Sequence, residues 1–260
     1  YGTLGQNNRT FYSSPVQIPG TTWTTKAFIN NSAACIRTDG TLWMWGLNNL
    51  GQLGQNNTTN RSSPVQIPGT TWAQVGGNYG HFAATKTNGT LWAWGNGGGM
   101  LGQNNTTARS SPVQIPGTTW TDKISLGRKA AYAIKSDNTL WAWGNNNGGV
   151  LGRNTPDNVH YSSPLQIPGT NWAQVSGSGG TTLCFALATK TDNTLWSWGY
   201  NQYGCLGHNQ RYTPGSGQEA KSSPTQIPGT NWGTGTQAVY GGQYYAFAVK
   251  QNGTLWAWGG

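Results

Sequence analysis

The sequence predicts an all-β protein: a β-propeller of five four-stranded blades, with the ring closed by the N-terminal strand pairing with the last blade. Two observations predict this fold. The tetrapeptide Trp-x-Trp-Gly occurs five times, with gaps of 49, 49, 55 and 60 residues, and a further Trp follows each of five Ile-Pro-Gly-Thr-x segments, so all 15 tryptophans are repeat positions. A period of about 50 residues with several short strands per unit is typical of propeller blades.

One repeat shows the four expected strands. Residues 72–75 and 82–86 form the first two, followed by a Thr-Asn-Gly-Thr turn of the kind found in tight hairpins. Residues 91–94 form the third, with apolar side chains on both faces, and 112–115 form a fourth that begins at a proline. The alternative is an open array of five hairpins, which would leave two apolar faces exposed to water at its ends.

The two ends of the chain predict how the ring closes. The chain begins inside the loop that elsewhere follows Trp-x-Trp-Gly, and it stops just before that loop. Ser14 to Ile18 is therefore a spare fourth strand, and we expect it to pair with Leu255 to Trp258 so that no sheet edge is left free. We predict one domain over 1–260, with repeat units at 23–67, 72–115, 120–167, 172–227 and 232–260, the last completed by 1–18.

The composition is polar and basic but carries few charges. The chain has 15 Lys and Arg against 6 Asp and Glu, a net charge of +9, and only 8% charged residues. It has no run of about 18 apolar residues, so we expect no membrane insertion. The missing initiator Met and signal peptide suggest a processed chain or an excised domain. The three cysteines fit neither a disulfide framework nor a zinc pattern, and we expect three separate thiols: Cys35, Cys184 and Cys205.

Comparison of the repeats shows which segments the architecture leaves free to vary. The first variable interval runs from the Leu of Leu-Gly to the Ile of the next Ile-Pro-Gly, and its length in the five repeats is 14, 14, 14, 16 and 21 residues. The second runs from the Trp that follows Ile-Pro-Gly to the basic residue of the second strand, and its length is 14 to 18 residues. These loops follow the third and first strands, so in an up-and-down blade they emerge on one rim. A rigid scaffold with a variable loop face is common in binding proteins.

Charge and aromatic residues gather in the same loops. The variable loops hold ten basic and three acidic residues, a net +7, and the rest of the chain contributes +2. Such a field favours an acidic partner, although general solubility explains it equally well. Exposed Tyr among basic side chains suits sugar rings, anionic groups or a protein hot spot. Because the basic residues are spread round a ring and do not form a stripe, nucleic acid is an unlikely partner.

The longest variable loop, His208 to Lys221, is the predicted centre of the binding face. It is seven residues longer than the shortest equivalent and combines imidazole, guanidinium, phenol and ammonium groups. A flexible tip at 214–217 that is merely tolerated is the structural alternative. The predicted binding residues are Tyr200, Tyr203, His208, Arg211, Tyr212, Lys221, Arg61, Arg109 and Tyr161.

Residue patterns that would indicate catalysis are missing from the sequence. The six acidic residues are scattered, and His81, His160 and His208 belong to different repeats with no Cys partner. Glycine-rich strings such as 97–99 follow a strand but precede no helix, which argues against a phosphate-binding loop. We therefore expect no enzyme activity, no metal and no organic cofactor.

The segment Gly40 to Gly54, read as G-T-L-W-M-W-G-L-N-N-L-G-Q-L-G and followed by S-S-P-V-Q-I, resembles the regulator-of-chromosome-condensation repeat family. The match spans all five units. The bacterial and bacteriophage members with I-P-G-T-x-W between repeats are the most similar in style, and they imply a surface or virion protein. The family is typically seven-bladed, so five repeats imply an incomplete chain or a different blade count.

The resemblance also sets what is expected of the function. Nothing here matches a GTPase-binding acidic face, so the eukaryotic nucleotide-exchange and chromatin activity is not carried over, and the G-W-R-H-T motif of the plant ultraviolet photoreceptor is absent. We expect an extracellular or virion-surface adhesion or structural module that contacts a cell-surface glycan, a protein partner or neighbouring virion proteins. The alternative is a propeller that binds and inhibits a protein, like the β-lactamase inhibitors of the family.

Overall fold

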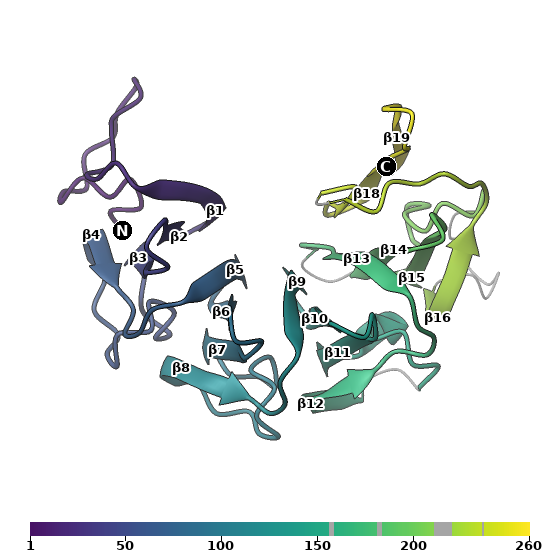
Figure 1. The fold of residues 1–260 in the computed structure, drawn as a ribbon, viewed down its shortest axis with the longest axis horizontal. Helices are drawn as coiled ribbons and strands as arrows, with labels where there is room; N and C mark the ends of the chain where they lie inside the picture. The colour runs from purple at the N-terminus through teal and green to yellow at the C-terminus, as the bar shows by residue number, and fades with distance from the viewer. Residues whose placement is uncertain (156–158, 181–183, 211–219, 236) are drawn as a thin grey trace. The chain divides into compact units, whose positions relative to one another are not determined.

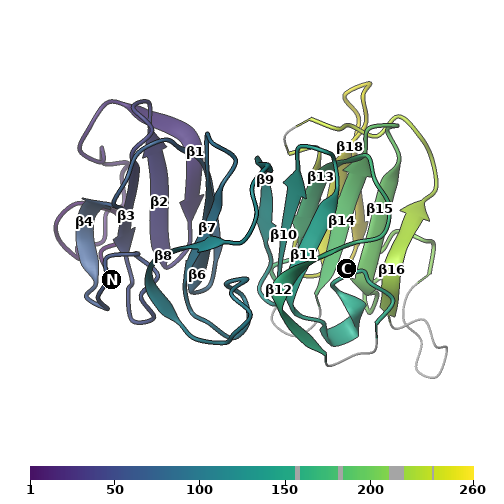
Figure 2. The same cartoon turned by 60° about the horizontal axis from the view of Figure 1, so that its bottom comes forward.

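The computed structural model describes the chain except for residues 156–158, 181–183, 211–219 and 236. The described residues form five antiparallel sheets, each made of strands that are consecutive in the sequence (Figure 1). The chain divides into two compact units, Tyr1–Thr118 and Thr119–Gly260. Within each unit the strands of a sheet run side by side (Figure 2).

The first unit holds two four-stranded sheets. Both follow the order of the sequence, with every neighbouring pair antiparallel. The first sheet consists of β1 (Trp23–Ile29), β2 (Ser32–Arg37), β3 (Leu42–Gly46) and β4 (Arg61–Gln66), and the second of β5 (Trp72–Asn78), β6 (His81–Lys86), β7 (Leu91–Gly95) and β8 (Arg109–Ile115).

The second unit holds two further four-stranded sheets and a last sheet that has three strands among the described residues. The third sheet consists of β9 (Trp120–Leu126), β10 (Ala130–Lys135), β11 (Leu140–Asn145) and β12 (His160–Gln166), with the short 3-10 helix η1 (Asn147–Gly149) after β11. The fourth consists of β13 (Trp172–Gly177), β14 (Phe185–Lys190), β15 (Leu195–Tyr200) and β16 (Ala220–Ile227), and the last of β17 (Val239–Gly241), β18 (Tyr245–Val249) and β19 (Leu255–Gly259).

A local hydrogen-bond motif sets each turn between the second and third strands. Asp39 Oδ1 accepts from both the backbone N–H (2.9 Å) and the hydroxyl (2.6 Å) of Thr41. The residue between them has a positive φ, 75° at Gly40, and Asn138 takes that place at 60° in the third sheet. Gly and Asn are the residues that adopt this conformation at least cost, so the Thr-Asp-Gly-Thr sequence specifies the turn.

The predicted β-propeller fold with repeated four-stranded sheets is confirmed, with two corrections to the strands. First strands run further than expected, since β5 continues to Asn78. Fourth strands begin earlier, and Pro112 lies inside β8 and not at its start. The β7–β8 register shifts between Ala93 and Gly95, so the strand bulges there, and an outer strand with a bulge tolerates a residue without an N–H.

The N-terminal segment packs against the first sheet. Trp45 Nε1 donates to the carbonyl of Thr3 (2.8 Å), and Ile18 packs on the cluster of Ala33, Cys35 and Trp45. In the second sheet Trp94 Nε1 donates in the same way to the carbonyl of Gln52 (2.9 Å). Residues 14–18 carry no strand, so their pairing with β19 stays a prediction, as does the single domain over 1–260.

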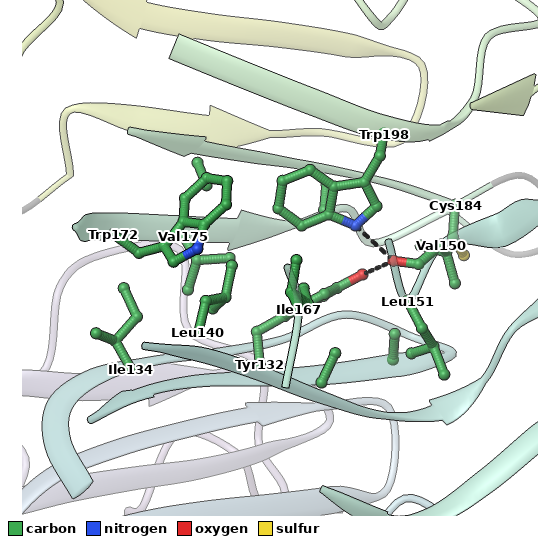
Figure 3. Packing of buried hydrophobic residues seen from close by; sticks show 14 residues of the cluster. Tyr132, Ile134, Leu140, Val150, Leu151, Ile167, Trp172, Val175, Cys184 and Trp198 are labelled. Carbon is green, nitrogen blue, oxygen red and sulfur yellow. Dashed lines mark hydrogen bonds between the residues drawn. The ribbon is translucent and has the colours of Figure 1, made fainter. Parts of the chain in front are cut away.

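Among the described residues, a buried cluster of 14 side chains lies in the second unit, between the third and fourth sheets (Figure 3). There the carbonyl of Val150 accepts from both Tyr132 Oη (2.6 Å) and Trp198 Nε1 (2.7 Å). Both donors are buried, so these bonds satisfy polar atoms that would otherwise be costly. The loop that carries Val150 is thereby fixed to the next sheet.

Within the described part of the chain, no helix is long and apolar enough to cross a membrane.

Candidate binding surface

Each sheet has two chemically different ends. In the second sheet Trp72 pairs with Lys86 at one end, and Asn78 pairs with His81 at the other. We call the first the turn end, because it carries the tight turn between the second and third strands, and the second the loop end. The long connection from β7 to β8 leaves from Gly95 at the loop end. The registers thus place the first and last residues of both variable connections at the loop end of the sheet.

Tyr200, at the loop end of the fourth sheet, is fixed by its neighbours. Its hydroxyl donates to Asn147 Oδ1 (3.0 Å), and its ring lies over Gly148, where a Cβ would collide with it. Gly148 also has a positive φ of 70°. The ring is half-buried, so Tyr200 joins the β15 end to η1 and offers only part of its surface to a partner.

Tyr203 forms an aromatic pair that reaches solvent. Its ring is 42% exposed and its centroid lies 4.7 Å from that of Tyr244, at an interplanar angle of 56°. The Tyr244 hydroxyl accepts from Gln243 Nε2 (2.8 Å), and the Tyr244 carbonyl accepts from the Cys205 thiol (2.9 Å). The Tyr203–Tyr244 pair is therefore a preorganised apolar surface with polar edges.

His208 has a structural partner that sequence reasoning did not foresee. Its Nε2 lies 3.0 Å from Ser197 Oγ, whose own proton goes to the carbonyl of Leu206 (2.7 Å), so Nε2 is the donor. Burial, and then the charge of Lys221, lower the pKa of His208. The same repeat position holds Gln55, whose Nε2 donates to the carbonyl of Gln66 (2.9 Å). His208 thus occupies a repeat position that links the loop to its own sheet.

Four of the predicted binding residues share one repeat position. Each lies near the start of a fourth strand and pairs with the glycine of Trp-x-Trp-Gly, as Arg109 does with Gly95. Arg61 is exposed, and the other three are half-buried. Each belongs to a different sheet, so the strand pairing within a sheet does not bring any two of them together. The four residues are Arg61, Arg109, Tyr161 and Lys221.

Two predicted residues, Arg211 and Tyr212, lie outside the described residues. The structure therefore brings together part of the predicted set: Lys221 is close enough to His208 to affect its pKa, and Tyr200 belongs to the same sheet. Tyr244, which completes the aromatic pair, was expected only as one of several loop tyrosines.

Cysteine and metal chemistry were also checked in the structure. All three cysteines are free and buried, which confirms three separate thiols. Burial raises the pKa of Cys205 to about 11, and it also raises the pKa of Cys35 and Cys184. Over the described ranges, no group of three or more His, Cys, Asp or Glu side chains could hold a metal ion.

The turn end carries a feature that sequence reasoning missed. In every sheet the basic residue of the second strand lies between two tryptophans, as Lys86 does with its Nζ 4.6 Å from the Trp72 ring and 4.7 Å from the Trp92 ring. Such contacts are cation–π interactions. The constant eight-residue interval to the second Trp of Trp-x-Trp-Gly was the available signal. The other four are Arg37 (Trp23, Trp43), Lys135 (Trp120, Trp141), Lys190 (Trp172, Trp196) and Lys250 (Trp232, Trp256).

The three tryptophans of a repeat have different hydrogen-bond roles. In the second sheet Trp92 Nε1 donates to Thr90 Oγ1 (3.0 Å) and locks the turn. Trp94 Nε1 donates to the preceding repeat, at the carbonyl of Gln52. Trp72 Nε1 is buried and has no acceptor, and the same holds for Trp23, Trp120, Trp172 and Trp232. Each sheet therefore leaves one indole donor beside its sandwiched cation.

Comparison with known proteins identifies the repeat. The model for the regulator of chromosome condensation (RCC1) repeat matches residues 39–84, 137–185 and 192–249, and a second RCC1 repeat model matches 122–149. No curated protein matches the chain by sequence.

Solved structures share the fold. They include yeast RCC1 (Prp20) bound to Kap60, at 21% identity and a TM-score of 0.73 over 88% of this chain and 54% of that one. Prp20p from Saccharomyces cerevisiae is 21% identical, with a TM-score of 0.73 over 88% of this chain and 56% of that one. Human WBSCR16 is 18% identical, with a TM-score of 0.72 over 88% of this chain and 59% of that one. This chain thus spans little more than half the length of these proteins. The repeat matches cover more than half of the chain, and it belongs to the RCC1 repeat family.

Proposed function

We propose that this chain is a non-catalytic binding propeller that contacts its partner through the loop end of the fourth and last sheets. The Tyr203–Tyr244 pair, in which Tyr203 is exposed and Tyr244 half-buried, is the observation that carries the proposal. Exposed tyrosine pairs combine a large apolar area with low conformational freedom, so they suit a sugar ring or a protein hot spot. Fold relatives bind proteins: Kap60 is bound to yeast RCC1, and Prp20p was studied with Gsp1p and histones.

The electrostatics favour an acidic or glycan surface as the partner. The chain carries a net charge of +9, and Lys221 pairs with Gly199 at the loop end of the fourth sheet, where the connection that carries Tyr203 begins. Basic charge near an aromatic surface attracts an anionic partner and speeds its encounter. We therefore propose attachment to a cell-surface glycan or acidic protein by an extracellular or virion-surface module. The resemblance to bacterial and bacteriophage repeats supports that location.

Replacing the long loop tests the proposal. Residues 209–220 are exchanged for the shorter equivalent 104–108, and the variant and the parent chain are applied to a glycan array and to an immobilised acidic polysaccharide at two salt concentrations. We expect weaker binding with a flatter salt dependence, because the exchange removes the Arg211 contact together with Tyr212, while the loss of Glu219 leaves the net charge unchanged. Unchanged binding at both salts would exclude a contact through this loop, and unchanged binding of the variant Tyr203→Ala/Tyr244→Ala as well would overturn the proposal.

Two controls make the result specific. Tyr79→Ala removes an exposed tyrosine (56% exposed) from the loop end of the second sheet and should leave binding unchanged. Capture of one protein with no response on the glycan array would favour the alternative, a propeller that binds and inhibits a protein partner.

A further inference from the structure

A cavity of about 300 Å³ opens at the turn end of the second sheet. Lys86 and its two tryptophans form one side, and the Leu-Gly-Gln-Asn segment of the β3–β4 connection and the β8 strand form the other. This volume is at the small end of the range for ligand sites, about 300 to 1,000 Å³, and suits one sugar ring. The side chains that matter here are Gln55, Asn56, Trp72, Lys86, Trp92 and Ser111.

Lys86 lacks the nearby carboxylate that the equivalent basic residues of three other sheets have. In the first, third and fourth sheets an Asp follows the basic residue by two positions, and that carboxylate interacts favourably with the cation, as Asp39 does with Arg37. In the second sheet this position is Asn88, which makes the same bonds to Thr90 (3.2 and 2.7 Å) without a charge. The sequence has no Asp or Glu from 40 to 121.

An unsatisfied donor accompanies the cation. Trp72 is 3% exposed, lines the cavity, and its Nε1–H has no acceptor. In the first sheet the equivalent donors, Trp23 Nε1 and Arg37 Nη2, both lie within 3.2 Å of the point where a Cβ of Gly20 would be. In the second sheet only the cation lies near the equivalent glycine: Lys86 Nζ is 3.3 Å from the Cβ point of Gly69, and Trp72 Nε1 is more than 4 Å away.

We propose that this cavity binds the carboxylate-bearing ring of an acidic sugar. The carboxylate pairs with Lys86 Nζ, which has no acidic residue nearby in the sequence, and the sugar ring lies against the half-buried Trp92. Trp72 is almost fully buried and contributes by holding the lysine in place. Amide and hydroxyl groups of Gln55, Asn56 and Ser111 provide hydrogen-bond partners for sugar hydroxyls. This site is distinct from the loop-end surface of the proposed function and does not depend on it.

The last sheet has the same combination of a sandwiched lysine, an Asn in the turn and an adjacent opening. Its basic residue, Lys250, is followed at the same spacing by Asn252, and these two line a second opening together with Thr230, Asn231 and Gln251. Lys250 is also sandwiched between two tryptophans. Open space is therefore found beside the sandwiched lysine in two sheets whose turn carries Asn in place of Asp.

The test uses glucuronate as the probe and glucose as its neutral match, with binding followed by calorimetry and by the indole N–H resonances of the full chain. We expect saturable glucuronate binding at about millimolar affinity, since one ion pair and a few hydrogen bonds hold the ring. Lys86→Gln should abolish it. Lys86→Arg, which copies Arg37 of the first sheet, should retain it.

The decisive variant is Asn88→Asp, which copies the first, third and fourth sheets and keeps the turn bonds. It should weaken glucuronate binding at least about threefold through the added charge, whereas the same charge placed at exposed Thr107 (Thr107→Asp), in the β7–β8 connection, should not. Equal binding of glucose and glucuronate, equal effects of the two added carboxylates, or no saturable binding at millimolar glucuronate would each overturn the site.

Discussion

The two ends of the sheets follow different rules. At the turn end the second and fourth sheets are nearly identical: Trp92 donates to Thr90 at 3.0 Å, Trp196 donates to Thr194 at 2.8 Å, and each holds a lysine against a second Trp. At the loop end they differ, since β5 and β6 are two residues apart and β13 and β14 seven. The residues and contacts of the repeat are thus the same at the turn end, where its side chains form hydrogen bonds and cation–π contacts with one another.

This difference shows what can change without loss of the fold. Turn-end residues are tied to cations, turns and neighbouring strands, so a substitution there disturbs several partners. Loop-end tyrosines such as Tyr79, Tyr203 and Tyr240 are 56%, 42% and 58% exposed. We therefore expect turn-end substitutions to affect stability, with glucuronate binding at the second-sheet cavity as the exception, and loop-end substitutions to affect binding of the partner.

The largest effect should come from deleting residues 1–18, which supply contacts that no single side chain can replace. Trp45 would lose its acceptor at Thr3, and Ile18 would no longer cover Cys35 and Trp45. The predicted fourth strand for the last sheet would be lost as well. We expect aggregation or a loss of about 3 kcal/mol or more. A truncated chain that stays monomeric in size-exclusion chromatography with unchanged melting would contradict both the packing and the closure.

Trp172→Ala at the turn end should be the most damaging single substitution. Trp172 is 1% exposed and packs in the core cluster between the third and fourth sheets, over Lys190, so its removal should cost about 3 to 5 kcal/mol. Tyr203→Ala at the loop end should cost only about 0.5 kcal/mol. Urea unfolding of the two variants compares them directly, and similar costs would argue against the division between the two ends.

Thr139→Val should have an intermediate effect. The Thr139 hydroxyl donates to Asp137 (2.7 Å) and accepts from Trp141 Nε1 (2.9 Å), and valine keeps the shape but loses both bonds. We expect a loss of about 1 to 2 kcal/mol in chemical unfolding. Asp137→Asn is the matched control, because Asn88 makes the equivalent bonds in the second sheet. If Thr139→Val left unfolding unchanged, the turn motif would not contribute to stability.

The smallest effect concerns pH. The pKa values of Asp39, Asp137 and Asp192 lie below the usual 3.8. The main cause in each case is a hydrogen bond from the hydroxyl of the Thr two residues later in the chain. A carboxylate with a lowered folded pKa adds stability above its unfolded pKa, and that stability is lost as the pH falls through the folded pKa. We expect the triple Asp→Asn variant to lose less stability than the parent between pH 6 and about pH 3. An equal loss in both chains would show that these turns do not contribute to acid sensitivity.

The fold was predictable because its signals repeat. Five copies of Trp-x-Trp-Gly and Ile-Pro-Gly-Thr-x-Trp fix strand, turn and blade together, and the cysteines were correctly expected to be separate thiols. The start of β8 at Arg109, before Pro112, was missed, because tolerance of proline inside the strand depends on a bulge that only the register reveals.

The site was less predictable because exposure and partners are set by packing. His208 was predicted to contact a ligand, and that stays a prediction; its contact with Ser197, eleven residues away in the sequence, could not be foreseen from spacing alone. Arg61 and Lys221 were predicted as binding residues from their charge, and the strand pairing shows that they occupy the same position of the repeat. The sandwiched cations were missed because a constant spacing does not show which side chains meet.

The division between the two ends can be measured most directly by pairing stability with binding in the same two variants. The loop-end double variant Tyr203→Ala/Tyr244→Ala and the turn-end variant Thr139→Val are compared with the parent by urea unfolding and by binding to the immobilised acidic polysaccharide. Our account predicts weaker binding with nearly unchanged unfolding for the first, and the reverse for the second. Unchanged binding in the loop-end variant, or equal binding losses in both, would contradict it.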